Sequence, residues 1–185
     1  RPEAKAKQMA EKEKIEIKEV IEDSNQSVHV DYPFYLLLSE RESKDTNDLS
    51  LISYFTYDHL TYLFMGDASK QIEKRLMATY DLKADVIKVG HHGSNTSSDP
   101  DFLDSLDCKV ALISCGYKNK YGHPSVETLK TLETLHINTL CTSDCGSIAM
   151  YSLFHFSFVV TNDGMFGIIW TLFIFFTEKT KAWFL

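Results

Sequence analysis

Hydrophobic and polar residues follow two different periods along the chain, and each change of period marks a new element. Residues 51–65 are rich in aromatic and β-branched side chains and are interrupted at Asp58 and His59. This pattern predicts a hairpin whose second strand ends at Gly66 and Asp67. The apolar strand therefore leads directly to a carboxylate.

A helical period follows this hairpin. Residues 68–80 place Ile72, Leu76 and Met77 on one face, with Ser69 near the start of the helix. We expect that face to pack against the sheet.

Strand-like and helix-like segments then alternate through the next part of the chain. We expect strands over residues 85–89, 109–114, 139–142 and 147–151, and helices over residues 100–106 and 125–135. Ser125 is the expected N-cap of the second of these helices. The alternation predicts an α/β layered domain.

The N-terminal third has a weaker pattern. Residues 3–23 predict a short helix followed by a strand, residues 28–38 an extended segment around Pro33, and residues 39–48 a polar loop. The expected domain spans residues 1–152.

Residues 153–185 form an atypical hydrophobic tail. Phenylalanine at every second position from Phe154 to Phe158 predicts a strand, and residues 162–164 predict a tight turn. The first interpretation is a hairpin that covers the sheet. The alternative is membrane association through residues 165–176, a run shorter than the roughly 20 residues needed to cross a bilayer.

Composition narrows the class of protein. A chain of 185 residues with 44% hydrophobic and 24% charged residues is typical of a globular domain and excludes a disordered segment. The formal net charge of -7 argues against a generally basic nucleic-acid-binding surface, so a nucleic-acid role requires local positive charge or a metal ion. The four cysteines lack the density of a disulfide scaffold and are expected to be reduced thiols.

Three loops carry residues suited to chemistry, and the first contains Asp67. Because Asp67 follows an apolar strand, rigid backbone holds its carboxylate in a position suited to a metal ligand. Asp is also a common helix N-cap, and from this residue alone the cap is the favoured interpretation.

The second loop contains the adjacent His91 and His92, framed by Gly90 and Gly93. Two imidazoles beside a backbone that can turn tightly favour a metal or catalytic role. Neighbours in an extended chain project to opposite sides, so only one of the two rings is expected to face a given point.

The third loop, residues 119–124, directly precedes the helix that begins near Ser125. Gly122 and Pro124 have an architectural explanation, since they shape the entrance to that helix. His123 lies between them, where an imidazole is suited to donating a proton or a hydrogen bond to an oxyanion. The functional and the architectural interpretation both stay open.

Together these segments resemble the later motifs of the metallo-β-lactamase superfamily and, within it, the C-terminal domain of the ComEC competence proteins and their stand-alone relatives. The resemblance runs from about residue 47 to residue 148 and is carried by FMGD at 64–67, ADVIKVGHHGSNTSS at 84–98, ISCG at 113–116, NKYGHP at 119–124 and TSDCG at 142–146. It implies an αββα sandwich, of which this chain would form only the C-terminal half.

The resemblance also implies a site. Asp67 matches a carboxylate that bridges two metal ions and takes part in catalysis, and His91 or His92 matches the late histidine ligand, with His91 slightly preferred. His123 matches a Gly-His-Pro element near the cleft and would assist as a proton donor. The implied cofactor is Zn²⁺, with one or two ions in the complete protein.

The implied reaction is attack of activated water on a phosphodiester or a related ester. Likeness to the ComEC proteins further implies DNA as substrate or partner, a link to DNA uptake, and a bacterial extracytoplasmic or membrane-associated location. Without that likeness, a cytoplasmic location is expected.

One signature of the superfamily is absent from the sequence. His-x-His-x-Asp-His does not occur, and residues 1–66 contain only the isolated His29 and His59. About two or three ligands are left, so we expect this chain alone to bind zinc weakly. Either the chain is the C-terminal half of a hydrolase whose N-terminal half supplies the missing ligands, or it is a degenerate accessory domain without catalytic activity.

Overall fold

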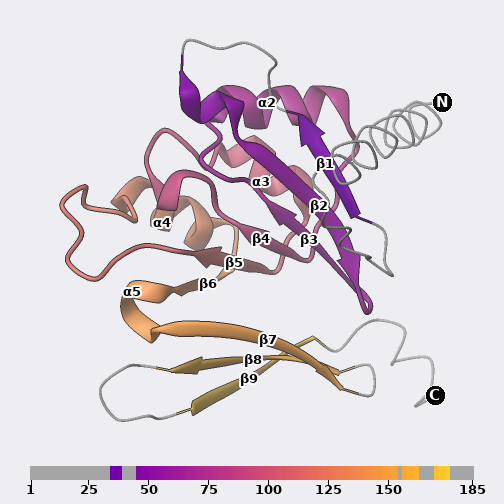
Figure 1. Ribbon diagram of the computed structural model, residues 1–185, viewed down its shortest axis with the longest axis vertical. Coiled ribbons are helices and arrows are strands. Elements are labelled where there is room, and N and C mark those ends of the chain that lie inside the picture. The colour runs from indigo at the N-terminus through magenta and orange to yellow at the C-terminus, as the bar shows by residue number, and fades with distance from the viewer. Residues whose placement is uncertain (1–33, 39–44, 154–155, 163–168, 176–185) are drawn as a thin grey trace, which may run out of the picture.

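A computed structural model describes residues 34–38, 45–153, 156–162 and 169–175, which form two β-sheets and a set of helices (Figure 1). The strands of the larger sheet are β1 Phe34–Leu38, β2 Leu51–Tyr57, β3 Leu60–Phe64, β4 Val86–Lys88, β5 Val110–Ile113 and β6 Asn138–Cys141. The α-helices are α2 Lys70–Thr79, α3 Pro100–Leu106, α4 Val126–Thr134 and the single turn α5 Thr142–Cys145.

The larger sheet has the strand order β1-β2-β3-β4-β5-β6. The first three strands pair antiparallel, and β3 to β6 pair parallel, so most of the sheet is parallel. Leu63 pairs with Ile87, and Ile87 pairs with Ala111. The expected α/β class is therefore confirmed, and the loops that follow β3, β4 and β5 meet at one edge of the sheet.

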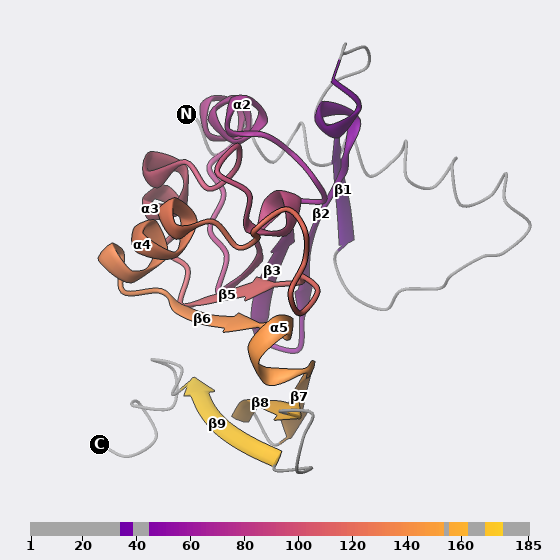
Figure 2. The same cartoon turned by 90° about the vertical axis from the view of Figure 1, so that its left-hand side faces the viewer.

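Helices α2, α3 and α4 lie on one face of this sheet, as Figures 1 and 2 show. The apolar core beneath them is formed by side chains such as Ile72, Ile87, Phe102 and Leu132, each at most 1% exposed. Burying each side chain of this kind contributes roughly 1.5–3 kcal/mol, so this face anchors the sheet.

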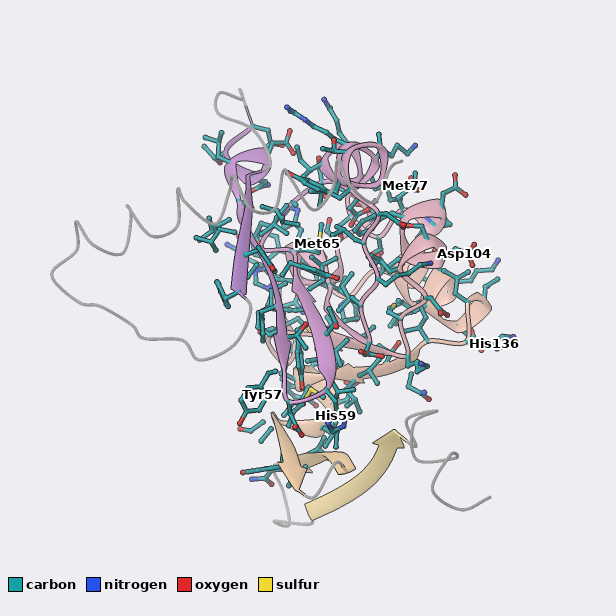
Figure 3. All side chains as sticks on the ribbon, turned by 90° about the vertical axis from the view of Figure 1, so that its right-hand side faces the viewer. Tyr57, His59, Met65, Met77, Asp104 and His136 are labelled. Atoms are coloured by element: carbon teal, nitrogen blue, oxygen red, sulfur yellow. The ribbon has the colours of Figure 1, made fainter. Side chains whose placement is uncertain are left out.

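The expected apolar face of α2 is wrong at one position. Met77 is 37% exposed and lies at the outer surface (Figure 3), whereas Glu73 is 1% exposed. The Glu73 carboxylate accepts hydrogen bonds from the backbone N–H of Ser98 at 2.8 Å and of Asp99 at 2.6 Å. These bonds offset the cost of burying a charged group, and they join α2 to the loop before α3.

A second sheet of three antiparallel strands lies on the face of the larger sheet opposite the helices (Figures 1 and 2). Its strands are β7 Ser147–Leu153, β8 Phe156–Asn162 and β9 Ile169–Phe175. Met150 of β7 packs against a cluster that includes the buried Tyr62, Val86 and Val110 of the larger sheet. The described residues therefore form three layers: helices, sheet and sheet.

β8 and β9 pair antiparallel, as expected for a hairpin in the tail, whereas residues 163 and 164 of the predicted tight turn lie outside the described residues. The ladder between β7 and β8 runs across the expected domain boundary between residues 152 and 153. Within the described residues, no helix has the length and apolar character needed to cross a membrane.

Much of the N-terminal third lies outside the described residues. The helix and strand expected over residues 3–23 lie outside the described residues, as do residues 28–33 and 39–44. Thr46–Leu49 forms a short 3₁₀ helix where a loop was expected, because the Asp45 side chain accepts a hydrogen bond from the Asn47 N–H and caps it.

Candidate functional site

The loops after β3 and β4 are joined through their backbones. The N–H of His91 donates a hydrogen bond to the carbonyl of Gly66 at 3.1 Å. A Cβ atom at Gly90 would lie 2.8 Å from the carbonyl oxygen of Ala68, so this close approach requires glycine. The backbone contact brings Asp67 and the two histidines to one place.

The two histidines occupy a tight left-handed turn over Gly90–Gly93. His91 has a φ of 46° and His92 a φ of 55°, a conformation that costs roughly 1–3 kcal/mol for each residue. The backbone here is therefore not extended, although the sequence suggested that it is, and the two ring centroids lie 6.5 Å apart. Strain of this kind is concentrated at functional sites.

His92 is the histidine that lies beside Asp67. Its Nδ1 atom lies 2.6 Å from the carbonyl oxygen of Ser114, which can only accept, so Nδ1 carries the proton in the neutral ring. The Nε2 lone pair is then directed to the other side, where Nε2 lies 3.7 Å from Oδ1 of Asp67. Two acceptors that face each other repel unless a proton or a cation lies between them.

Asp67 does not cap the following helix. Ser69 occupies the N-cap position of α2, so the cap interpretation favoured from the single residue is wrong. The Asp67 N–H donates to the Ser50 hydroxyl at 2.9 Å, and its carboxylate is 44% exposed. The side chain is thus accessible and is oriented toward the histidine loop.

His91 has different neighbours. Its Nδ1 atom lies 3.1 Å from the hydroxyl of Thr96, and its ring centroid lies 5.9 Å from that of His123. The slight preference for His91 from sequence thus differs from the geometry, in which His92 accompanies Asp67 and His91 links the pair to His123.

The loop that carries His123 is held by Asn119. The Asn119 side chain accepts from the His123 N–H at 2.9 Å and donates to the carbonyls of His123, at 2.6 Å, and Gly116, at 3.0 Å. Burial, followed by the charges of the rings of His91 and His92, lowers the pKa of His123. Its Nδ1 atom is shielded from solvent and has no hydrogen-bond partner in the described part of the chain.

The chain matches no protein-family model. It is 35% identical over 120 residues to ComE operon protein 3 of Bacillus subtilis, covering 64% of this chain and 16% of that protein. It is 34% identical over 121 residues to competence protein ComA of Neisseria gonorrhoeae, covering 64% of this chain and 17% of that protein. The chain is similar to competence proteins.

A shorter match to a protein with another name accompanies these two. The chain is 37% identical over 70 residues to recombination protein 2 of Haemophilus influenzae, covering 38% of this chain and 9% of that protein. The chain spans about a sixth of the length of the two competence proteins. The similarity therefore concerns one segment of those larger proteins.

Lys88 is a charged residue next to the site, and the sequence pattern assigned no role to it. It ends β4, is half-buried, and has its pKa lowered by burial, while the charge of Asp67 acts in the opposite direction. A lysine within the mostly apolar segment ADVIKVG at residues 84–90 is the sequence feature that points to a functional role for Lys88.

The described residues offer few metal ligands at this site. Within the described ranges, no group of three or more His, Cys, Asp or Glu side chains is arranged to hold a metal ion. The carboxylate of Asp67 and the oriented Nε2 of His92 nevertheless fit two positions of a zinc site, because metal-binding histidines usually donate their other N–H to a carbonyl or carboxylate. Catalytic zinc needs at least one more protein ligand.

Proposed function

We propose that this chain carries part of the active site of a metal-dependent hydrolase that cleaves a phosphodiester, with DNA as its substrate during DNA uptake. The observation that carries the proposal is the orientation of His92, whose Nε2 lone pair faces the Asp67 carboxylate at 3.7 Å while the Ser114 carbonyl holds Nδ1. The competence names of the relatives support DNA as the substrate.

The layer order supports a metallo-β-lactamase-like fold. The described residues form a helical layer, a mostly parallel sheet and a second sheet, which correspond to three of the four layers of an αββα sandwich. The candidate residues follow β3 and β4 at the carboxyl edge of the larger sheet, where α/β proteins place their ligands. We propose that the fourth layer belongs to a part of the complete protein outside this chain.

Asp67 and His92 are the residues that would hold the metal. The carboxylate contributes negative charge that offsets the charge of the cation, and the neutral imidazole contributes a directional lone pair. A zinc ion bound there would supply a Lewis acid and a water of lowered pKa. We propose that the remaining ligands come from the same outside part that supplies the fourth layer.

In this proposal, His123 and Lys88 assist the cleavage of the phosphodiester. The lowered pKa of His123 favours the neutral ring, and a ring N–H could donate to a phosphate oxygen or to the leaving oxygen. The Lys88 ammonium lies within electrostatic range of Asp67 and adds positive charge where a phosphodiester carries negative charge.

The loop next to His123 has side chains suited to a nucleic-acid strand. Tyr117 is 75% exposed and Tyr121 is 69% exposed. The Nζ atoms of Lys118 and Lys120 lie 5.2 Å and 4.9 Å from the centroids of these two rings. Aromatic faces that stack on bases, combined with cations that neutralise phosphates, bind nucleic acid even on a chain of net negative charge.

A cleavage assay on the complete gene product that contains this chain tests the proposal. Linear DNA is incubated with the protein and either Zn²⁺ or Mn²⁺, and D67A is compared with D104A. We expect D67A to lose at least about 100-fold in rate, because loss of a metal ligand removes the activated water. Asp104 lies on the exposed side of α3 near the periphery (Figure 3), so D104A should cleave like the parent.

Circular dichroism spectra check that both variants are folded. Equal cleavage by folded D67A and D104A would show that Asp67 takes no part in the reaction. Hydrolysis of another ester but not of DNA would support the hydrolase activity and contradict DNA as the substrate.

A non-catalytic accessory domain is the second candidate. The absence of a cluster of three metal-ligand side chains from the described residues favours it. This candidate predicts that the complete protein cleaves no DNA with either metal while still binding it, and that D67A binds DNA as the parent does.

A further inference from the structure

The side chains of Cys115 and Cys141 meet at the carboxyl ends of β5 and β6. Their sulfur atoms lie 3.1 Å apart, and both cysteines are free thiols. Cys141 is 5% exposed and Cys115 is half-buried. The parallel pairing of Ile113 with Cys141 brings the two strand ends together, so this contact is a consequence of the sheet register.

Thr142 fixes the backbone on one side of this contact. Its hydroxyl oxygen accepts from the Cys115 N–H at 2.9 Å and donates to the Cys115 carbonyl at 2.8 Å. A disulfide needs an S–S distance of about 2.05 Å, so the sulfur atoms need to move by only about 1 Å. Rotation about a Cα–Cβ bond moves the sulfur but not the Cys115 backbone, which the Thr142 hydroxyl holds.

We propose that Cys115 and Cys141 are a redox modification site that forms a reversible disulfide with a small-molecule disulfide as the oxidant. The cross-link closes the segment of residues 116–140, which contains the His123 loop and α4. Because Ser114, whose carbonyl orients His92, directly precedes Cys115, the cross-link lies one residue from the candidate site. The inference does not depend on the proposed hydrolase activity.

The chemistry has two balanced steps. The Cys115 thiolate, the more exposed of the two, attacks one sulfur of the oxidant, forms a mixed disulfide and releases one small-molecule thiolate. Cys141 then loses its proton to water and attacks the Cys115 sulfur, which closes the protein disulfide and releases the second thiolate. Two protein thiols are oxidised and one small-molecule disulfide is reduced to two thiols.

The environment of Cys141 supports this order of attack. Burial raises the pKa of Cys141 to about 11, so its thiolate is rare at neutral pH and it acts as the resolving thiol. Cys108 is a matched control. Burial also raises its pKa to about 11, but it precedes the first residue of β5, whereas Cys115 follows the last.

The test is disulfide mapping of the native chain after incubation with excess oxidised glutathione at pH 8. Remaining thiols are blocked, and tryptic peptides are analysed by mass spectrometry. We expect a linked pair of peptides that contain Cys115 and Cys141, with Cys108 blocked as a free thiol. No Lys or Arg separates Cys141 from Cys145, so C145S is mapped in parallel and should form the same link.

Thermal unfolding gives an independent readout. Closing a loop of this length should raise Tm by roughly 5–10 °C in the oxidised chain relative to the reduced chain. C115S should show no such rise, whereas C108S should show the full rise.

Three results would overturn the inference. These are the absence of any linked peptide, a glutathione adduct on Cys115 that persists without closing, and a link that involves Cys145 and disappears in C145S.

Discussion

The Nε2 atom of His92 lies 3.7 Å from Oδ1 of Asp67, and the Ser114 carbonyl holds the opposite side of the same ring at 2.6 Å. The three residues follow β3, β4 and β5, which are neighbouring parallel strands. Parallel pairing brings the carboxyl ends of such strands together, so the topology of the sheet creates this arrangement.

Replacing Asn119 with Ala is expected to loosen the His123 loop. The substitution removes hydrogen bonds to the N–H and carbonyl of His123 and to the carbonyl of Gly116, each worth roughly 0.5–1.5 kcal/mol. We expect the free energy of unfolding to fall by about 1–3 kcal/mol in urea titrations and amide exchange to accelerate over residues 116–123.

K120A is the matched control for Asn119, since Lys120 is exposed in the same loop. It should change neither the stability nor the exchange rates by a measurable amount. Equal exchange in N119A and K120A would show that Asn119 does not hold the loop.

Stability should fall as the pH rises from about 4.5 to about 7 because of Glu73. Burial raises the pKa of this carboxyl from 4.5 to about 7, although the N–H groups of Asp99 and Ser98 act in the opposite direction. The folded chain therefore binds more protons than the unfolded chain in this window, and it loses that advantage, up to about 3 kcal/mol, as the pH rises through the folded pKa. Above pH 7 the contribution levels off.

The measurement is urea unfolding at pH 5 and pH 7.5 in the parent and in E73Q. A glutamine cannot ionise, so the loss of stability between pH 5 and pH 7.5 should be smaller in E73Q than in the parent. The difference between the two proteins is the contribution of Glu73. An identical pH dependence in both proteins would mean that Glu73 has an ordinary pKa.

The sequence predicts the elements of this chain better than it predicts their contacts. The hairpin interrupted at Asp58 and His59, the helix over Pro100–Leu106 and the Ser125 N-cap are all confirmed, because each depends on local periodicity or on a local hydrogen bond. Glu73 is buried, against the hydropathy pattern, because its hydrogen-bond donors belong to a loop far along the chain.

The residues of the candidate site are also predicted by local features. Glycine, histidine and aspartate directly after strands indicate Asp67, His91 and His92. The sequence does not predict the role of the Ser114 carbonyl, because every residue has a backbone carbonyl. The left-handed conformation of His91 and His92 is also invisible to residue propensities, since non-glycine residues seldom adopt it.

The most direct test of the central claim follows the histidine ring nitrogens of ¹⁵N-labelled protein by NMR during a Zn²⁺ titration. Without zinc, the His92 proton should reside on Nδ1. Zinc should shift Nε2 of His92 at concentrations that leave the exposed His136 unchanged, and D67N should weaken that binding by about 10-fold or more. A His92 Nε2 signal that moves only together with that of His136, or that is unaffected by D67N, would contradict a cation shared by Asp67 and His92.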